Sequence, residues 1–399
     1  MSTPATLQAG IYIDRGVPPL PAWRALFLDV EQGVTASATR QAVNQIIRML
    51  TELRAGTLRD VGPDTAPTHS FDTLVGFGAS FFDSVLHAPR LTDKDRPAGL
   101  VRLRRDGNAF PAIPWSTRPH IPSLCSGEAD LLLQFTGKSD HAVSRAAVET
   151  AHVIRDARLP IRVVGTYDGF QRDDGRSWLG FHDGISNIEP SQRPAAVTCA
   201  GDPDWNTGGT YLAYLRLEIS LDQWRQLSRT DQELIVGRDK ATGWPIVSID
   251  QTREPPLVEP LSREPLTDST PWRIRNAYFN PPDTGCPAIE ASHTHRTNQN
   301  KAAGTTPAGH RIYRQGYEYL EDITADGPRL GLNFISFQND LLHLQQILGL
   351  RGWLGDANFG GANQLHTPAP TLTTLTAGGL YVVPPRSAPF PGADLLDGI

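Results

Sequence analysis

Cysteine is scarce in this sequence. Three cysteines, Cys125, Cys199 and Cys286, lie far apart among 399 residues. An odd number of cysteines at such spacings forms neither a disulfide framework nor a zinc ribbon. The N-terminal residues also lack the basic and apolar regions of a secretion signal. We therefore expect a cytoplasmic protein whose thiols are reduced and structural.

Long apolar runs and blocks of basic residues are missing as well. The longest apolar stretches, such as 130–135 and 379–383, have the length of strands, whereas a membrane-spanning helix needs roughly 18 residues. Lysine and arginine total 37 against 43 acidic residues, which gives a net charge of −6. A mildly acidic chain without a basic block is a poor binder of nucleic acid. Neither a membrane nor nucleic acid is expected as a partner.

The sequence does contain enough apolar material for a large core. Hydrophobic residues make up 39% of the chain and charged residues 20%, which is far from the composition of a disordered protein. At roughly 150 residues per domain, the length corresponds to two or three domains. The 36 glycines and 33 prolines indicate many turns and long ordered loops.

Two similar series of elements follow each other along the chain. The first reads strand, helix, strand, strand, helix, which is typical of an antiparallel sheet covered by helices. Residues 188–209, rich in proline and glycine, interrupt the pattern before a comparable series begins. We predict an α+β protein with two domains, 1–190 and 191–399. The expected strands cover 9–13, 25–30, 74–78, 129–135, 210–217, 332–337 and 380–383, and the expected helices 43–53, 141–157, 221–235 and 340–348.

The first candidate for chemistry is the motif Gly180-Phe-His-Asp-Gly184. Glycines on both sides of a histidine and an aspartate let the backbone approach a flat or bulky ligand closely, because no Cβ intervenes. The alternative is a glycine-rich turn in which Asp183 merely accepts hydrogen bonds from nearby backbone N–H groups. The motif alone does not decide between the two.

A histidine pair forms the second candidate. His293 and His295 are two residues apart, so on a strand they would face the same side and could share a metal. On a helix they would diverge, and at most one would reach a given centre. The sequence lacks the H-E-x-x-H and C-x-x-C patterns of zinc sites, which weakens a metal-dependent hydrolase as a hypothesis. Polar loop histidines are the remaining alternative.

The third candidate is the segment His310-Arg-Ile-Tyr-Arg-Gln-Gly-Tyr317. Arginines at 311 and 314 among apolar residues and glycine favour a guanidinium aimed at an anionic or oxygen-rich site, and a surface salt bridge is the alternative. The sequence has no phosphate-binding loop, dinucleotide fingerprint or Gly-x-Ser-x-Gly motif.

Taken together, these motifs resemble those of the dye-decolourising (DyP-type) haem peroxidases. Gly180–Gly184 is similar to that family's Gly-x-x-Asp-Gly motif, and the resemblance continues in the family's order over most of the chain. The other similar segments are 72–81, 126–133, 285–298, 311–316, 331–337 and 379–384. Each segment is a weak signal alone, but the ordered set is specific.

The resemblance implies a fold, a cofactor and roles for several residues. Members of the family have two ferredoxin-like α+β domains, each an antiparallel sheet with helices packed on it, and bind haem b in the second domain. His293 corresponds to the axial ligand of the iron, Asp183 to the residue that moves a proton, and Arg314 to the distal arginine. The expected substrates are hydrogen peroxide and small aromatic electron donors, which include phenols and dyes. The further residues expected around the haem are Gly184, Ile185, Ser186, Arg296, Leu332 and Phe334.

Four points differ from the family or stay open. About two extra residues separate Cys286-Pro287 from His293. The acidic residue that often bonds the proximal histidine is not evident, so Asp340, Asp356 or a backbone carbonyl is expected to replace it. A haem-handling, deferrochelatase-like protein with incidental peroxidase activity is the alternative function, and whether the chain forms a homo-oligomer is left open.

Overall fold

A computed structural model describes residues 6–14, 16–58, 71–85, 128–201, 204–297, 311–348 and 372–396. Three residues named above, Cys125, His310 and Asp356, lie outside these ranges. Among the residues that the structure describes, no helix is both long and apolar enough to cross a membrane.

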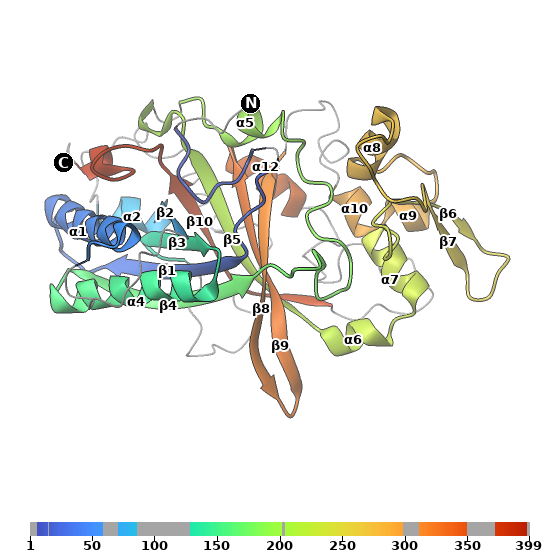
Figure 1. The fold of residues 1–399 in the computed structure, drawn as a ribbon, viewed down its shortest axis with the longest axis horizontal. Coiled ribbons are helices and arrows are strands. Elements are labelled where there is room, and N and C mark those ends of the chain that lie inside the picture. Colours follow the sequence, from blue (N-terminus) through green and yellow to red (C-terminus); the bar gives the residue numbers. More distant parts are fainter. Residues whose placement is uncertain are drawn as a thin grey trace.

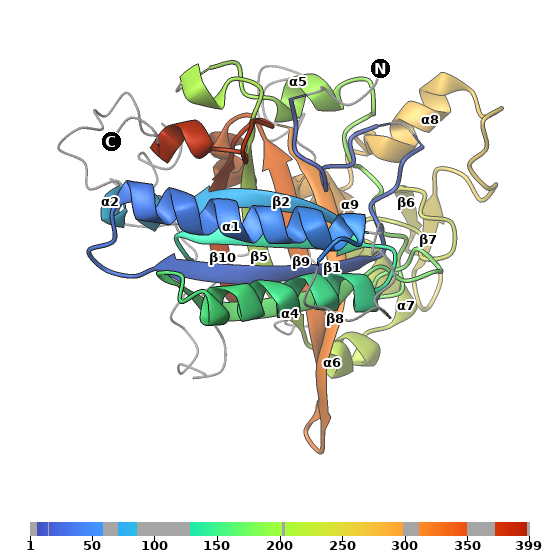
Figure 2. The same cartoon turned by 60° about the vertical axis from the view of Figure 1, so that its left-hand side comes forward.

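The first half of the chain forms a four-stranded antiparallel sheet in the order β4-β1-β3-β2. Two long helices, α1 and α4, lie side by side across its outer face (Figure 2). The elements are β1 (Ala22–Val30), α1 (Ala36–Ala55), β2 (Phe71–Gly78), α2 (Ala79–Ser84), β3 (Leu131–Gly137), α4 (Asp140–Asp156) and β4 (Ile161–Phe170).

The second half supplies four more antiparallel strands in the order β10-β5-β9-β8. Most of its short helices and a small hairpin lie on the side of the molecule away from α1 and α4, and the β8–β9 hairpin extends beyond the barrel (Figure 1). The strands are β5 (Thr210–Ile219), β6 (Ile246–Asp250), β7 (Leu257–Pro260), β8 (Tyr313–Thr324), β9 (Gly327–Gln338) and β10 (Thr373–Val383), and the helices α5 (Arg193–Val197), α6 (Leu221–Gln226), α7 (Arg229–Val236), α8 (Trp272–Phe279), α9 (Pro287–Glu290), α10 (His293–Arg296) and α12 (Leu341–Leu348).

The two sheets join at both edges into one closed eight-stranded barrel. One junction pairs β10 with β2, and the other pairs β4 with β8 through Phe170 and Glu318. The predicted α+β class is confirmed. If the four barrel strands of each half are numbered 1 to 4 along the chain, their order in the sheet is 4-1-3-2 in both halves. This is the strand order of the split βαβ arrangement. The division into domains 1–190 and 191–399 stays a prediction.

Local sequence explains where the long helices begin and end. The Thr35 hydroxyl accepts a hydrogen bond from the Ala38 N–H at 3.2 Å, which caps the start of α1. Gly56 adopts φ 71° at its end, a left-handed conformation that glycine adopts without steric cost. Between them, Val43, Ile46 and Leu50 recur at spacings of three and four and are buried against the sheet.

Aromatic side chains fill the inside of the barrel. Trp23 stacks between Tyr214 and Tyr317, with ring centroids 5.9 and 5.8 Å apart, and Phe27 contacts Tyr214 and Tyr381. Each buried aromatic ring contributes on the order of 1.5–3 kcal/mol of hydrophobic stabilisation. Because this interior is filled, a binding cavity has to lie outside the barrel.

Two sequence expectations about secondary structure were wrong. Residues 9–13 form no strand, because the Gln315 side chain accepts from the Tyr12 N–H at 2.9 Å and donates to the Gly10 carbonyl at 3.0 Å. The helix expected over 221–235 is two helices, since the Ser228 hydroxyl caps a new start by accepting from Asp231 N–H.

Candidate functional site

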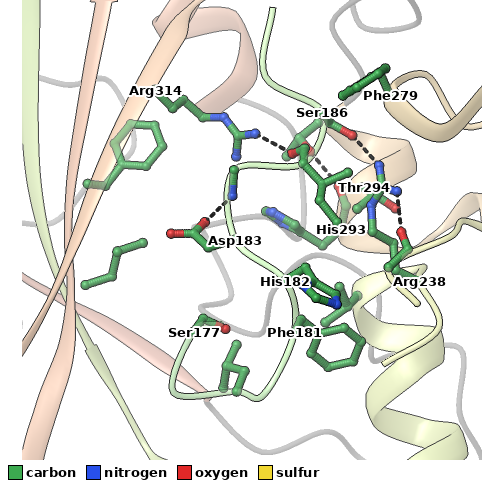
Figure 3. A pocket seen from close by; sticks show the side chains of 18 of the residues that line it. Ser177, Phe181, His182, Asp183, Ser186, Arg238, Phe279, His293, Thr294 and Arg314 are labelled. Carbon is green, nitrogen blue, oxygen red and sulfur yellow. Dashed lines mark hydrogen bonds between the residues drawn. The ribbon is translucent and has the colours of Figure 1, made fainter. Parts of the chain in front are cut away.

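A cavity lies against the outer face of β8, β9 and β5, with α7, α10 and the loop 177–188 around it (Figure 3). Its volume is about 200 Å³. Most of the residues that the sequence singled out line it. These are Asp183, Gly184, Ile185, Ser186, His293, Arg314, Leu332 and Phe334.

Strand alternation places one group of side chains on the cavity. Tyr313 and Tyr317 of β8 point into the filled barrel, so Arg314, Gly316 and Glu318 face outward. Arg314 pairs with Ser336 and Glu318 with Leu332 of β9. The β8 strand therefore presents a cation and a carboxyl group to the same cavity, four residues apart.

Arg314 is held in place along its whole length. The Asn187 side chain accepts from the Arg314 N–H at 3.0 Å and donates to its carbonyl at 2.8 Å. The Arg314 Nη2 donates to the Ile185 carbonyl at 2.8 Å. Burial lowers the pKa of Arg314, and the charge of Asp183 acts in the opposite direction. A guanidinium nevertheless keeps its proton at physiological pH, so the cavity contains a fixed positive charge.

Asp183 both accepts a hydrogen bond within the glycine-rich turn and lies on the cavity. Its Oδ1 accepts from the Gly184 N–H at 2.7 Å, the hydrogen bond that a glycine-rich turn predicts. Its Oδ2, however, lies beside Gly316, only 3.5 Å from where a Cβ on that glycine would stand. Gly184 adopts φ 74°, which lets the chain turn sharply after the aspartate. One carboxylate oxygen therefore stabilises the turn, and the other lies next to β8 on the cavity.

One ring nitrogen of the neighbouring His182, Nε2, is within hydrogen-bond distance of two groups of the surrounding loops. The His182 Nε2 lies 2.9 Å from Arg176 Nη2 and 3.2 Å from the Ala241 carbonyl oxygen. The same arginine also donates to the Gly180 and Lys240 carbonyls, each at 2.7 Å. His182 therefore helps to hold the loop, whereas the Asp183 carboxylate lines the cavity.

His293 enters the cavity from a one-turn helix, α10. Burial lowers its pKa to about 3, and the charges of Arg314 and Arg238 act in the same direction. The imidazole is therefore neutral at physiological pH, the form that binds a metal.

His295 lies on the same short helix but does not line the cavity. It is 2% exposed, and its Nδ1 lies 3.4 Å from Glu290 Oε2. The helical alternative for the pair thus holds, because residues two apart on a helix diverge. Among the described residues, no group of three or more histidine, cysteine, aspartate and glutamate side chains could hold a metal ion. A hydrolase with a shared His293/His295 metal is not supported.

Arg238, which sequence reasoning missed, is the most deeply buried cation of the cavity wall. Its guanidinium is 3% exposed and donates to the Gly243 carbonyl at 2.7 Å, to the Tyr278 carbonyl at 2.9 Å and to the Ser186 hydroxyl. All three partners are neutral, and burial lowers the pKa of Arg238 to about 9. A lone arginine after an apolar helix gives no signal in the sequence, because its burial depends on distant segments.

Two expected residues lie elsewhere. Arg296 does not line the cavity, and its Nε donates to the Ala291 carbonyl at 3.0 Å. Asp340 caps α12, where its Oδ1 accepts from the Leu342 N–H at 2.9 Å, and it does not line the cavity either. Arg311, by contrast, lines the cavity and donates to the side chains of Gln192 and Asn280.

Comparison with known proteins places this fold in a class. Over 100% of this chain and 97% of the other, the structure matches ferric DtpA from Streptomyces lividans with a TM-score of 0.71 and 21% sequence identity. It also matches a DyP-type peroxidase from Cellulomonas bogoriensis with a TM-score of 0.70 and 21% identity, over 99% and 97% of the two chains. The fold is therefore that of the DyP-type peroxidases.

The sequence itself gives the family. The family model described as "Dyp-type peroxidase, C-terminal" matches residues 174–388, more than half of the chain. The chain belongs to the DyP-type peroxidase family.

Curated relatives carry two different names. A dye-decolorizing peroxidase of Thermobifida fusca is 27% identical over 81% of this chain and 71% of its own length. One of Brevibacterium linens is 29% identical, over 56% and 53% of the two chains. A deferrochelatase of Escherichia coli is 26% identical, over 70% and 49%. This chain therefore spans about half the length of two of these three relatives.

The cavity suits the cofactor that the family implies. Haem has two apolar faces, two anionic propionates and an iron that needs one strong axial ligand. The cavity offers a neutral imidazole at His293, apolar walls that include Leu332 and Phe334, and a buried cation at Arg238 whose hydrogen-bond acceptors among the described residues are all neutral. The residues present therefore fit haem.

Proposed function

We propose that this protein is a haem peroxidase, which reduces hydrogen peroxide and oxidises organic donors such as phenols and bulky dyes in one-electron steps. The observation that carries the proposal is the meeting of His293, Asp183 and Arg314 in one cavity. These residues come from a short helix, a glycine-rich loop and a strand that are far apart in sequence. They are a ligand for iron, a group that moves a proton and a fixed positive charge.

In this proposal, His293 would bind the iron of haem b, and the apolar side chains of Leu332 and Phe334 would pack against the ring. Arg238 would form ion pairs with the propionates. Bound haem supplies the redox-active iron that exchanges electrons with peroxide and donor. The protein residues around it hold the substrate, move protons and keep water out.

Asp183 and Arg314 divide the work on peroxide. Cleavage of its O–O bond requires a proton to move from one oxygen to the other, and the Asp183 carboxylate can accept that proton and then return it. Arg314 stabilises the negative charge that develops on the departing oxygen. Because Ile185 and Asn187 already fix Arg314, its charge needs little rearrangement during the reaction.

We expect Asp183→Asn to slow the reaction with hydrogen peroxide by about 10²–10⁴-fold, the usual contribution of a general acid–base residue. The amide keeps the size of the side chain and can still accept from the Gly184 N–H, so the loop and bound haem should be preserved. Stopped-flow mixing with peroxide, followed by haem absorbance, measures the rate. A wild-type rate at every pH would show that Asp183 is only a structural part of the turn.

The direct test of the proposed function is turnover of the haem-loaded protein. Hydrogen peroxide and a phenolic donor should give donor oxidation that depends on both substrates and continues for many cycles. Haem loaded onto bovine albumin at the same concentration serves as the background control. Donor oxidation no faster than this control would contradict a peroxidase function.

The second candidate is a haem-handling protein with incidental peroxidase activity. The observation that favours it is the curated deferrochelatase, a relative that aligns with 70% of this chain. The two functions differ in what happens to the cofactor. A haem-handling protein should lose haem or release iron faster than it oxidises donor, whereas a peroxidase should retain haem through many turnovers. Absorbance of iron-free porphyrin, recorded together with donor oxidation, separates them.

A further inference from the structure

Glu318 is a buried carboxyl group that the mechanism above leaves without a role. Its residue is 4% exposed and lies on β8, between Leu332 of β9 and Phe170 of β4. The Oε1 accepts a hydrogen bond from the Trp178 N–H. The Oε2 is buried and has no hydrogen-bond partner among the described residues. A buried oxygen without a partner is costly for a carboxylate and less so for a protonated carboxyl group.

Glu318 faces the same space as the proposed catalytic residues. It lines the candidate site and also a second, adjoining cavity of about 450 Å³. Asp183 and Arg314 line both cavities as well. The second cavity continues past Phe170 and Arg172. Water in it can therefore connect Glu318 with Asp183.

Burial and the charges around Glu318 shift its pKa in both directions, and the upward shift is the larger. The pKa of Glu318 is raised from the ordinary 4.5 to about 8. Burial is the main cause, and the negative charges of Asp183 and Asp174 also raise this pKa. The Trp178 N–H and the charge of Arg172 act in the opposite direction. Its strand neighbours Leu332 and Phe170 are uncharged. The other charged residues that line these cavities are Asp14, Arg176, Arg193, Arg238, Arg311 and Arg314.

We propose that Glu318 is a proton-supplying residue of this site, which holds a proton in the cavity that it shares with Asp183 and returns it to the Asp183 carboxylate. This proposal rests on the peroxidase function proposed above. Reduction of hydrogen peroxide to two waters takes up two electrons and two protons, and the proton that Asp183 moves during O–O cleavage adds nothing to this total. In the donor-driven steps that follow cleavage, the O–H bond of Glu318 breaks and an O–H bond forms on the Asp183 carboxylate, directly or through one water. The negative charge passes from Asp183 to Glu318 in this transfer. Asp183 then gives the proton to the peroxide-derived oxygen that leaves as the second water and is a carboxylate again before the next peroxide reacts, while solvent protonates Glu318 through the adjoining cavity.

The first test measures the buried proton in the cofactor-free protein. Between pH 4.5 and 8 the folded protein binds a proton at Glu318 that the unfolded chain has released. The contribution of Glu318 to stability is therefore complete below pH 4.5 and is lost as the pH rises to about 8. Glu318→Gln removes this dependence and keeps the shape of the side chain. We expect the melting temperature of the variant to rise relative to the wild type, by at least roughly 2–4 °C, between pH 5 and 8.

Glu321→Gln is the matched control, because Glu321 lies on the same strand but outside both cavities and pairs with Arg329 at 2.9 Å. The melting temperature of Glu321→Gln shows the effect of replacing a glutamate of β8 that lies outside the cavities. A melting-temperature difference between wild type and Glu318→Gln that does not change between pH 5 and 8 would overturn the proposal, because Glu318 would then hold no proton at neutral pH.

The second test measures delivery of the proton in the haem-loaded protein. With excess peroxide and ferrocyanide, a donor that supplies electrons but no protons, we expect Glu318→Gln to oxidise the donor about tenfold more slowly than the wild type at pH 7–8. At pH 5, where solvent supplies protons readily, the two rates should converge. In the Asp183→Asn background, Glu318→Gln should have no further effect, because Glu318 acts through Asp183. Parallel pH profiles, or additive effects of the two substitutions, would overturn the delivery of protons through Asp183.

The two tests keep this inference separate from the proposed function. A wild-type protein that does not turn over peroxide at any pH would overturn the peroxidase function, and the transfer to Asp183 with it, while the pH-dependent melting temperature would still establish the buried proton. An active peroxidase with parallel profiles would overturn the role of Glu318 alone.

Discussion

Replacement of His293 with alanine should remove most of the bound haem. Loss of residues that merely orient a ligand lowers metal affinity about 10–100-fold, so loss of the ligand itself should cost at least that much. The neutral imidazole of His293 lines the cavity, and within the described residues no cluster of metal-ligating side chains could replace it. The measurement is a titration of cofactor-free protein with haem, followed at the Soret band.

His295→Ala is the matched control for this prediction. His295 lies two residues away on the same helix but is buried against Glu290, outside the cavity. Its replacement should leave the Soret band nearly intact, although the protein will lose some stability because a buried side chain is removed. If His295→Ala loses haem while His293→Ala retains it, the ligand lies two positions further along the chain and the alignment of this segment with the family is wrong.

Replacement of Arg314 with leucine should slow the reaction with hydrogen peroxide by about 10²–10³-fold, the usual effect of removing one group that stabilises developing charge. Because Arg314 stays charged, the loss should be similar at every pH between 4 and 8, unlike the pH-dependent loss expected for Glu318→Gln. The leucine packs beside Leu332 and Phe334, so haem should remain bound. Stopped-flow absorbance at several pH values measures the effect.

Arg314→Lys is the control that keeps the charge and changes its geometry. This variant should recover part of the lost rate, because lysine keeps the positive charge. The recovery should be incomplete, because lysine cannot both donate to the Ile185 carbonyl and hold its charge in the position of the guanidinium. An Arg314→Leu enzyme as fast as the wild type would show that the charge has no part in the reaction. A loss of haem in both variants would make Arg314 a cofactor-binding residue instead.

Local patterns in the sequence predicted the parts of the fold that depend on neighbouring residues. The spacing of Val43, Ile46 and Leu50 predicted α1, and the segment from His141 onwards predicted most of α4. The glycines around Asp183 indicated a close approach of the backbone, and the structure places this turn on the cavity. In these places, the hydrophobic period and the turn residues agree with the tertiary structure.

Features that depend on distant contacts were not predictable in this way. Closure of the barrel rests on a few pairs, such as Phe170 with Glu318, between strands on opposite sides of the expected domain boundary. Arg238 is buried by carbonyl groups that lie 5 and 40 residues further along the chain. Arg296 was expected at the haem, but its position on a short helix directs it to the Ala291 carbonyl.

Glu318 shows what a firmer strand assignment would have revealed. Once β8 is known to be a strand, residues 314, 316 and 318 fall on one face by alternation. The sequence alone left this segment open, and a glutamate between two tyrosines is ordinarily a surface residue. Its burial follows from the adjacent loop, which contributes the Trp178 N–H.

The absorption spectrum of the purified protein, produced with adequate haem supply, tests the central claim most directly. The proposed function predicts a strong Soret band at close to one haem per chain, which changes within milliseconds to seconds when hydrogen peroxide is added and returns when a phenolic donor follows. A protein that shows no Soret band after incubation with excess haem would contradict the assignment of His293, Asp183 and Arg314 to a haem peroxidase site.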